Sequence, residues 1–161
     1  AASDVYKRQG YYLNELMLSL LHRHDPQPEM FTVYGTAIAN LTAAEDVPAT
    51  LRRFEMEALG LLGYALILDH EALTGEGLVP ETRYEYRVEQ GPVAGGAADG
   101  PMAFTGAELE AIARQEFSSP ATLSNAGRLL RQVITWHLGG RELQSRKVLR
   151  EMRRVADHRT L

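Results

Sequence analysis

Residues 48–64 read PATLRRFEMEALGLLGY, and this stretch is the clearest helical signal in the chain. Proline stands in its first turn, where a missing N–H costs little, and Gly63 follows the last apolar residue as a helix stop does. We predict a helix over residues 48–62 with one apolar side turned inward. That side carries Leu51, Phe54, Ala58, Leu59 and Leu62.

Two further helices are predicted upstream of this stretch, over residues 11–24 and 28–44. The prolines at 26, 28 and 48 separate the three helices, because proline cannot continue the backbone hydrogen-bond ladder. In both helices apolar residues recur at steps of three and four, which predicts an inward stripe. The first stripe is Leu13, Leu16, Met17, Leu20 and Leu21, and the second is Met30, Phe31, Tyr34, Ile38 and Leu41.

Downstream of residue 64 the chain changes character. Residues 64–69 are predicted to be extended, and residues 71–104 are rich in glycine and proline. Residues 83–88, RYEYRV, alternate as a β-strand does, and Gly91-Pro92 is typical of a turn. We therefore predict a small β-hairpin insert whose tip lies at residues 95–100.

Three more helices are predicted to complete the chain. Thr105 with Glu108 has the spacing of a capping box, for a helix that ends near Phe117. Residues 119–120, Ser-Pro, open a long helix to about residue 138, where Gly139-Gly140 stop it. Ser145 is predicted to cap a last basic helix over residues 146–155. The predicted fold class is mainly α, a compact domain of about six helices with a β-hairpin insert.

Length and composition favour a single packed domain. The chain has 161 residues, 45% of them hydrophobic, and no cysteine, so disulfides and thiolate metal sites are excluded. We interpret residues 1–9 as a non-native leader, residues 10–157 as one helical domain, and residues 158–161 as a tail. The abrupt start inside a helix pattern suggests truncation at the N-terminus. Because no signal peptide or spanning run is recognisable, we expect a cytoplasmic protein.

Charge is distributed unevenly along the chain. Residues 121–161 carry nine Lys and Arg against three Asp and Glu, whereas residues 10–120 carry six against seventeen. A basic end on an acidic body indicates an anionic partner for that end. The alternative is that the arginines only keep the protein soluble.

Enzyme motifs are not found in the sequence. It has no phosphate-binding glycine loop, no G-x-S-x-G elbow and no H-E-x-x-H pair, and the predicted function is therefore binding rather than catalysis. His22, His24 and the Asp69-His70-Glu71 run could offer metal ligands, but solvated helix ends and loops are the simpler interpretation. We expect neither a cofactor nor structural zinc.

Three stretches of the chain carry motifs whose order and spacing match one protein family. They are YLNEL at residues 12–16, LRRFE at residues 51–55 with LLGY at 61–64 and Thr74-Gly75, and HLGGRELQSRKVL at residues 137–149. Together they resemble the RecO family of recombination mediators. The resemblance covers residues 10–152. It implies the helical C-terminal region of the family, without the N-terminal OB-fold barrel. Members with a zinc-binding insert have a C-x-x-C motif where this chain has Glu71, Thr74 and Gly75, so the chain resembles the zinc-free proteobacterial branch.

The resemblance also implies partners and candidate sites. The partners are single-stranded DNA, the RecR protein and the acidic C-terminal tail of the single-stranded-DNA-binding protein, SSB. Arg52, Arg53 and Met56 are the candidates for holding that tail, because a cationic rim beside an apolar ridge suits an acidic peptide that ends in an aromatic ring. The competing hypothesis is a generic helical adaptor. The candidates for binding DNA are Arg128, Arg131, Arg141, Arg146, Lys147 and Arg150.

Overall fold

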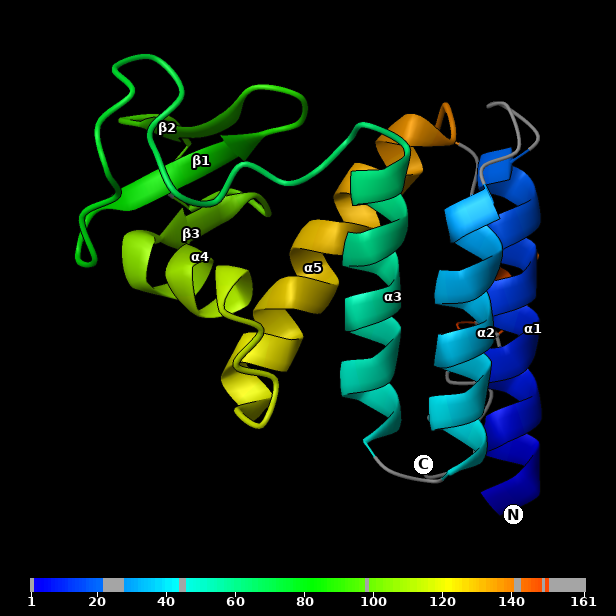
Figure 1. Cartoon of the computed structure of the whole chain (residues 1–161). Helices are drawn as coiled ribbons and strands as arrows, with labels where there is room; N and C mark the ends of the chain where they lie inside the picture. The colour runs from blue at the N-terminus through cyan, green and yellow to red at the C-terminus, as the bar shows by residue number, and fades with distance from the viewer. Residues whose placement is uncertain are drawn as a thin grey trace, which may run out of the picture.

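The computed structural model describes residues 2–21, 28–43, 46–97, 99–140, 143–148 and 150, with backbone alone for residues 2–6. Three long helices stand side by side: α1 (Ala2–Leu21), α2 (Pro28–Thr42) and α3 (Val47–Leu61) (Figure 1). Helix α5 (Pro120–His137) crosses the outer side of α3 and separates the three helices from a small sheet (Figure 1). The predicted class, mainly α with a β insert, is confirmed.

The apolar stripes predicted for α1 and α3 form the core. Leu13, Leu16 and Leu20 of α1 are almost completely buried, as are Phe54 and Leu59 of α3. The side chain of Asp46 accepts a hydrogen bond from the Ala49 N–H, and Pro48 occupies the first turn, so α3 begins where its sequence predicts. Gly63 follows with a φ of 84°, a left-handed conformation that favours glycine at a helix end.

Two expectations for the first helices were wrong. Helix α1 begins at Ala2 rather than near Tyr11. Residues 2–10 contain no proline, so the helical hydrogen bonds of the backbone extend through them. Phe31 was predicted to face inward, yet 55% of it is exposed. Met30 takes the buried position instead, since neighbouring residues on a helix point about a quarter turn apart.

The insert is an antiparallel sheet of three strands in the order β2-β1-β3, comprising β1 (Arg83–Arg87), β2 (Gly91–Ala94) and β3 (Ala103–Thr105). A hairpin forms from β1 and β2, but Gly91-Pro92 was wrongly predicted to be a turn: both residues lie in β2, where Pro92 pairs with Tyr86, and the turn is at residues 88–90. The third strand was not predicted, because its three residues are too few to show an alternating pattern. Tyr84 and Tyr86 turn to the buried face and join the sheet to the helical core.

Helix α4 (Gly106–Ala113) begins with the predicted capping box, in which Thr105 and Glu108 exchange hydrogen bonds. The helix ends at Ala113 and not near Phe117, because Gln115 has a φ of 54° and reverses the chain. Helix α5 has the predicted Ser119 cap, and Gly139 and Gly140 with positive φ stop it. These local signals determine where α4 and α5 begin and end. Helix α5 itself lies between the sheet and α3 (Figure 1).

A short helical segment, residues 144–148, follows α5. Ser145 was predicted to cap it, but Gln144 is already helical and the Ser145 Oγ accepts no cap hydrogen bond. The carboxylate of Glu15 on α1 takes that role. It accepts hydrogen bonds from the Gln144 N–H at 2.5 Å and the Ser145 N–H at 2.9 Å. A cap supplied across 129 residues leaves no local sequence signal, so the prediction failed for that reason.

Candidate functional site

The two adjacent arginines of α3 point to different surroundings. Arg52 turns toward α1 and α5 and its side chain is 18% exposed. A Cβ added at Gly127 of α5 would lie 2.9 Å from Arg52 Nη1, so the guanidinium packs against bare helix backbone. Arg53 is exposed, and its guanidinium carbon lies 5.7 Å from the centre of the Phe117 ring. Met56 is half-buried against the core, one turn from Arg52.

Arg52 belongs to a buried polar cluster, which we define as Tyr12, Arg52, Glu55 and Arg146. Glu55 has no exposed surface. Arg52 donates a hydrogen bond to Glu55 Oε1 at 3.0 Å, and its Nε lies 2.9 Å from Oε2 without the alignment of a hydrogen bond. Arg146 Nη2 lies 3.5 Å from the same carboxylate. The buried carboxylate of Glu55 is therefore held by two cations, Arg52 and Arg146, that are far apart in the sequence.

Tyr12 completes the cluster. Its hydroxyl donates to Glu55 Oε1 and accepts a hydrogen bond from Arg146 at 2.7 Å. Burial raises the pKa of Tyr12 far above its usual value, and the neighbouring Glu55 carboxylate adds to the effect. Tyr12 is thus a neutral donor, and the cluster carries two positive charges against one negative charge. This surplus favours an added anion at its partly exposed edge.

The basic residues predicted to contact DNA fall into two groups. Arg128 turns inward: it donates to the Pro101 and Ala103 carbonyls at 2.8 and 3.0 Å, and its guanidinium carbon lies 3.9 Å from the centre of the Phe104 ring. Arg146 is held in the polar cluster. Among the members that the structure describes, the predicted set therefore does not form one continuous basic patch.

The other members of the set lie at the surface or beyond the described chain. Arg131 on α5 is exposed, and so are Lys147 and Arg150 near the C-terminal end. Arg141 lies outside the described residues. Trp136, on the same helix as Arg131, exposes 59% of its surface.

Glu71 organises its loop by hydrogen bonds. Its Oε2 accepts from the Thr74 N–H and the Thr74 hydroxyl, each at 2.7 Å, and Oε1 accepts from the Ala94 N–H at 3.4 Å. The Thr74 hydroxyl is the main reason that the pKa of Glu71 is lowered. A charged carboxylate therefore ties the loop to β2. Within the described residues, no three His, Asp or Glu side chains come together as metal ligands would.

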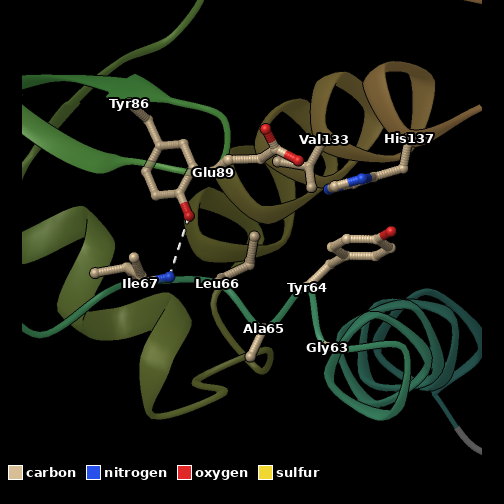
Figure 2. Close-up of a pocket in the computed structure, with 9 residues that line it drawn as sticks. All are labelled: Gly63, Tyr64, Ala65, Leu66, Ile67, Tyr86, Glu89, Val133 and His137. Atoms are coloured by element: carbon tan, nitrogen blue, oxygen red, sulfur yellow. Dashed lines mark hydrogen bonds between the residues drawn. The ribbon is translucent and has the colours of Figure 1, made fainter. Parts of the chain in front are cut away.

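A pocket of about 310 Å³ opens between the segment after α3, the β1–β2 turn and α5 (Figure 2). The rings of Tyr64 and His137 stack on one side, with centroids 3.9 Å apart and planes inclined by 22°. Tyr86 crosses the other side, and its hydroxyl accepts a hydrogen bond from the Ile67 N–H at 3.1 Å. Glu89 reaches toward the α5 wall at Val133 (Figure 2).

Sequence reasoning missed the polar cluster and this pocket. Tyr12 and Glu55 stand in the quoted motifs YLNEL and LRRFE, but neither was predicted to belong to a site. The Arg52–Glu55 spacing of three was the available signal for an ion pair on one helix face. Nothing local in the sequence indicates that Arg146 joins them, or that Tyr64 meets His137.

Comparison with known proteins covers most of the chain. The sequence model of the family described as "Recombination protein O C terminal" matches residues 9–147. A protein from Methylococcus capsulatus named "DNA repair protein RecO" is 44% identical over 88% of this chain and 57% of its own length. Proteins of the same name from Nitrosococcus oceani and an Azoarcus strain are 41% and 40% identical, over 92% and 89% of this chain.

The match extends over only part of those relatives. It covers 61% of the Nitrosococcus protein and 60% of the Azoarcus protein, so the chain spans about three-fifths of the length of the curated relatives that it matches. The structural features above therefore belong to one region of a longer kind of protein. No helix among the described residues is long and apolar enough to cross a membrane.

Proposed function

The chain belongs to the RecO family, and from that premise we propose that it is the helical part of a non-catalytic mediator of DNA repair and homologous recombination. In this proposal it binds SSB, RecR and single-stranded DNA in the cytoplasm, at the nucleoid, and thereby promotes strand annealing and recombinase loading. The relatives' printed name, DNA repair protein, supports the process. SSB and single-stranded DNA are proposed from the features of α3 and of the C-terminal end, and RecR from the family resemblance alone.

The observation that carries the proposal is the surplus positive charge around Glu55. Arg52 and Arg146 share one carboxylate, so a second carboxylate at the edge of the cluster would balance the charge. A guanidinium can hold a terminal carboxylate through two parallel hydrogen bonds. The tail of SSB, an acidic peptide with an aromatic C-terminal residue, offers such a group. Arg53, exposed on the outer side of α3, is available for the acidic residues upstream of it.

Met56 is the proposed contact for the terminal ring of the tail. It lies one turn beyond Arg52 and is half-buried, so part of its flexible thioether side chain remains accessible beside the core. Arg52 and Met56 share one helix face and can contact the same residue of a ligand. In this proposal the carboxylate of the terminal residue contacts Arg52 and its ring contacts Met56.

A tail-peptide titration tests the proposal. Arg52→Ala is expected to weaken binding of a fluorescently labelled SSB-tail peptide by roughly ten- to a hundredfold, the usual loss for one charged hydrogen-bonded contact. Met56→Ala is also expected to weaken binding, and Arg53→Ala to have a smaller effect. Fluorescence anisotropy measures the affinity, and circular dichroism checks each variant's fold, because Arg52 also neutralises Glu55.

Two controls make the result specific. Arg52→Lys retains the charge but not the two parallel donors, so its affinity should fall between those of wild type and Arg52→Ala. Arg114→Ala removes an exposed arginine on α4 that pairs with Glu110, and its affinity should match wild type. Unchanged binding by a folded Arg52→Ala chain would refute the assignment of α3. Absence of binding by wild type would favour the generic adaptor, whose basic end serves only solubility.

Binding of single-stranded DNA is proposed for the basic end of the chain. Of the six candidate residues, Arg131, Lys147 and Arg150 are exposed, which supports them as phosphate contacts, whereas Arg128 and Arg146 make contacts within the fold. Binding of an oligothymidine should weaken as salt rises, and removing one phosphate-binding cation should reduce the log–log slope by about 0.7. We expect this reduction for Arg131→Ala and Lys147→Ala, and no change for Arg114→Ala. Slopes that are identical in all variants would count against this surface.

A further inference from the structure

The pocket beside α5 is lined by an extended segment whose backbone is only partly paired. Residues 63–67 form one wall, and Ala65 is exposed while Leu66 is half-buried. Within the described part of the chain, the N–H groups of Ala65 and Leu66 have no hydrogen-bond partner. Many proteins bind an extended partner peptide by pairing unpaired backbone groups with it while a neighbouring pocket receives one of its side chains.

The wall of the pocket on the α5 side is aromatic. Tyr64 and His137 stack almost parallel, and Val133 continues the same wall one turn earlier on α5 (Figure 2). A flat aromatic surface suits a flat group or an extended alkyl stem. Arginine offers both, because its guanidinium is planar and stacks on aromatic faces.

The mouth of the pocket is acidic. Glu89 lies in the β1–β2 turn, is exposed, and has a φ of 67°, which is uncommon for a residue other than glycine. The turn is fixed against the pocket wall at Gly91, where an added Cβ would lie 3.1 Å from Ile67 Cβ. Asp69, which follows the wall segment, is not among the lining residues, and its carboxylate lies 2.7 Å from His70 Nδ1. Glu89 is therefore the carboxylate that lines the pocket.

We propose that this pocket binds an arginine side chain of an extended partner polypeptide. The guanidinium would meet the Glu89 carboxylate, its stem would lie along the Tyr64–His137 wall, and the partner's backbone would pair with the exposed Ala65. This site is separate from the α3 arginines and selects the opposite charge. Glu89 would repel the acidic tail proposed for α3, so the two sites serve different ligands.

The experiment uses the ¹⁵N-labelled chain and the peptide acetyl-Ala-Val-Arg-Val-Ala-amide. We expect amide resonances of Ala65, Leu66 and Glu89 to shift on titration. Glu89→Gln, which keeps the shape of the side chain, should weaken the peptide's affinity by about tenfold or more, as the loss of a charged hydrogen bond does. Glu81→Gln, an exposed acid outside the pocket, is the matched control and should bind like wild type.

Titrations with two further ligands test whether the pocket selects the arginine side chain. A peptide with citrulline in place of arginine keeps the shape without the charge, and it should bind at least about tenfold more weakly. Equal affinity for the citrulline peptide, or shifts confined to residues away from the pocket, would overturn the proposal. Oligothymidine should leave the Ala65 and Leu66 resonances unchanged; if it moves them and Glu89→Gln tightens its binding, the pocket receives a nucleotide and not arginine.

Discussion

Glu55→Ala is expected to destabilise the folded chain by about 3–5 kcal/mol, the usual cost of removing one partner of a buried ion pair. The substitution leaves Arg52 and Arg146, each 18% exposed, without their shared anion, and it deprives the Tyr12 hydroxyl of its acceptor. It also leaves space in a fully buried position. Urea unfolding followed by circular dichroism gives the free energy of unfolding.

Two variants separate the causes of that loss. Glu57→Ala, on an exposed position of the same helix, should change stability by less than about 0.5 kcal/mol. Glu55→Gln retains the volume and one acceptor oxygen, so it should retain part of the stability. If Glu55→Ala is as stable as Glu57→Ala, the cluster does not hold the C-terminal segment to α1 and α3 in the way described.

Phe104→Ala is expected to cost about 3–5 kcal/mol as well, through the cavity that it leaves. Phe104 has no exposed surface, and it lies in β3 beneath the guanidinium of Arg128. The ring therefore packs the insert onto α5, and its loss should affect the sheet and the helices together. Unfolding should be followed both by helical circular dichroism and by the amide NMR resonances of Tyr84 and Tyr86, which report the sheet.

The matched control for the ring is Phe31→Ala. Phe31 is 55% exposed on α2, so removing it should cost well under the value for Phe104, about 1 kcal/mol or less. Coincident transitions for both probes in the Phe104→Ala chain would show that insert and helices unfold as one unit. Earlier loss of the Tyr84 and Tyr86 resonances, with helices as stable as wild type, would contradict that coupling.

Local signals account for most of the fold that the sequence predicted. Prolines, glycines and caps act within a few residues, so the boundaries of α3 and α5 and the capping box at Thr105 could be predicted. Predictions failed where a distant residue decides the outcome. Glu15, not Ser145, caps the segment of residues 144–148. Gln115 has a left-handed backbone conformation, which a glutamine side chain does not predict.

The candidate site was less predictable than the fold, for the same physical reason. Sequence could show that Arg52 and Met56 share a face, but not that Glu55 engages Arg52 from within the core. It could show that the C-terminal end is basic, but not that Arg128 turns to the carbonyls of residues 101 and 103. Charge is readable from composition, whereas the partner of each charge depends on the tertiary contacts.

The cap that Glu15 provides also bears on how the chain folds. Its two hydrogen bonds join residues 129 and 130 positions apart, and the Arg146–Tyr12 hydrogen bond spans 134. Contacts of such long range close last, because the entropy of a large loop must be lost before they form. On the ribosome, α1 can pack against α2 early, but Tyr12 and Glu15 must wait for nearly the whole chain before residues 144–146 emerge. In the finished protein, residues 143–148 are held to α1 by these contacts, and amide hydrogen exchange can show whether the segment opens before the helical core does.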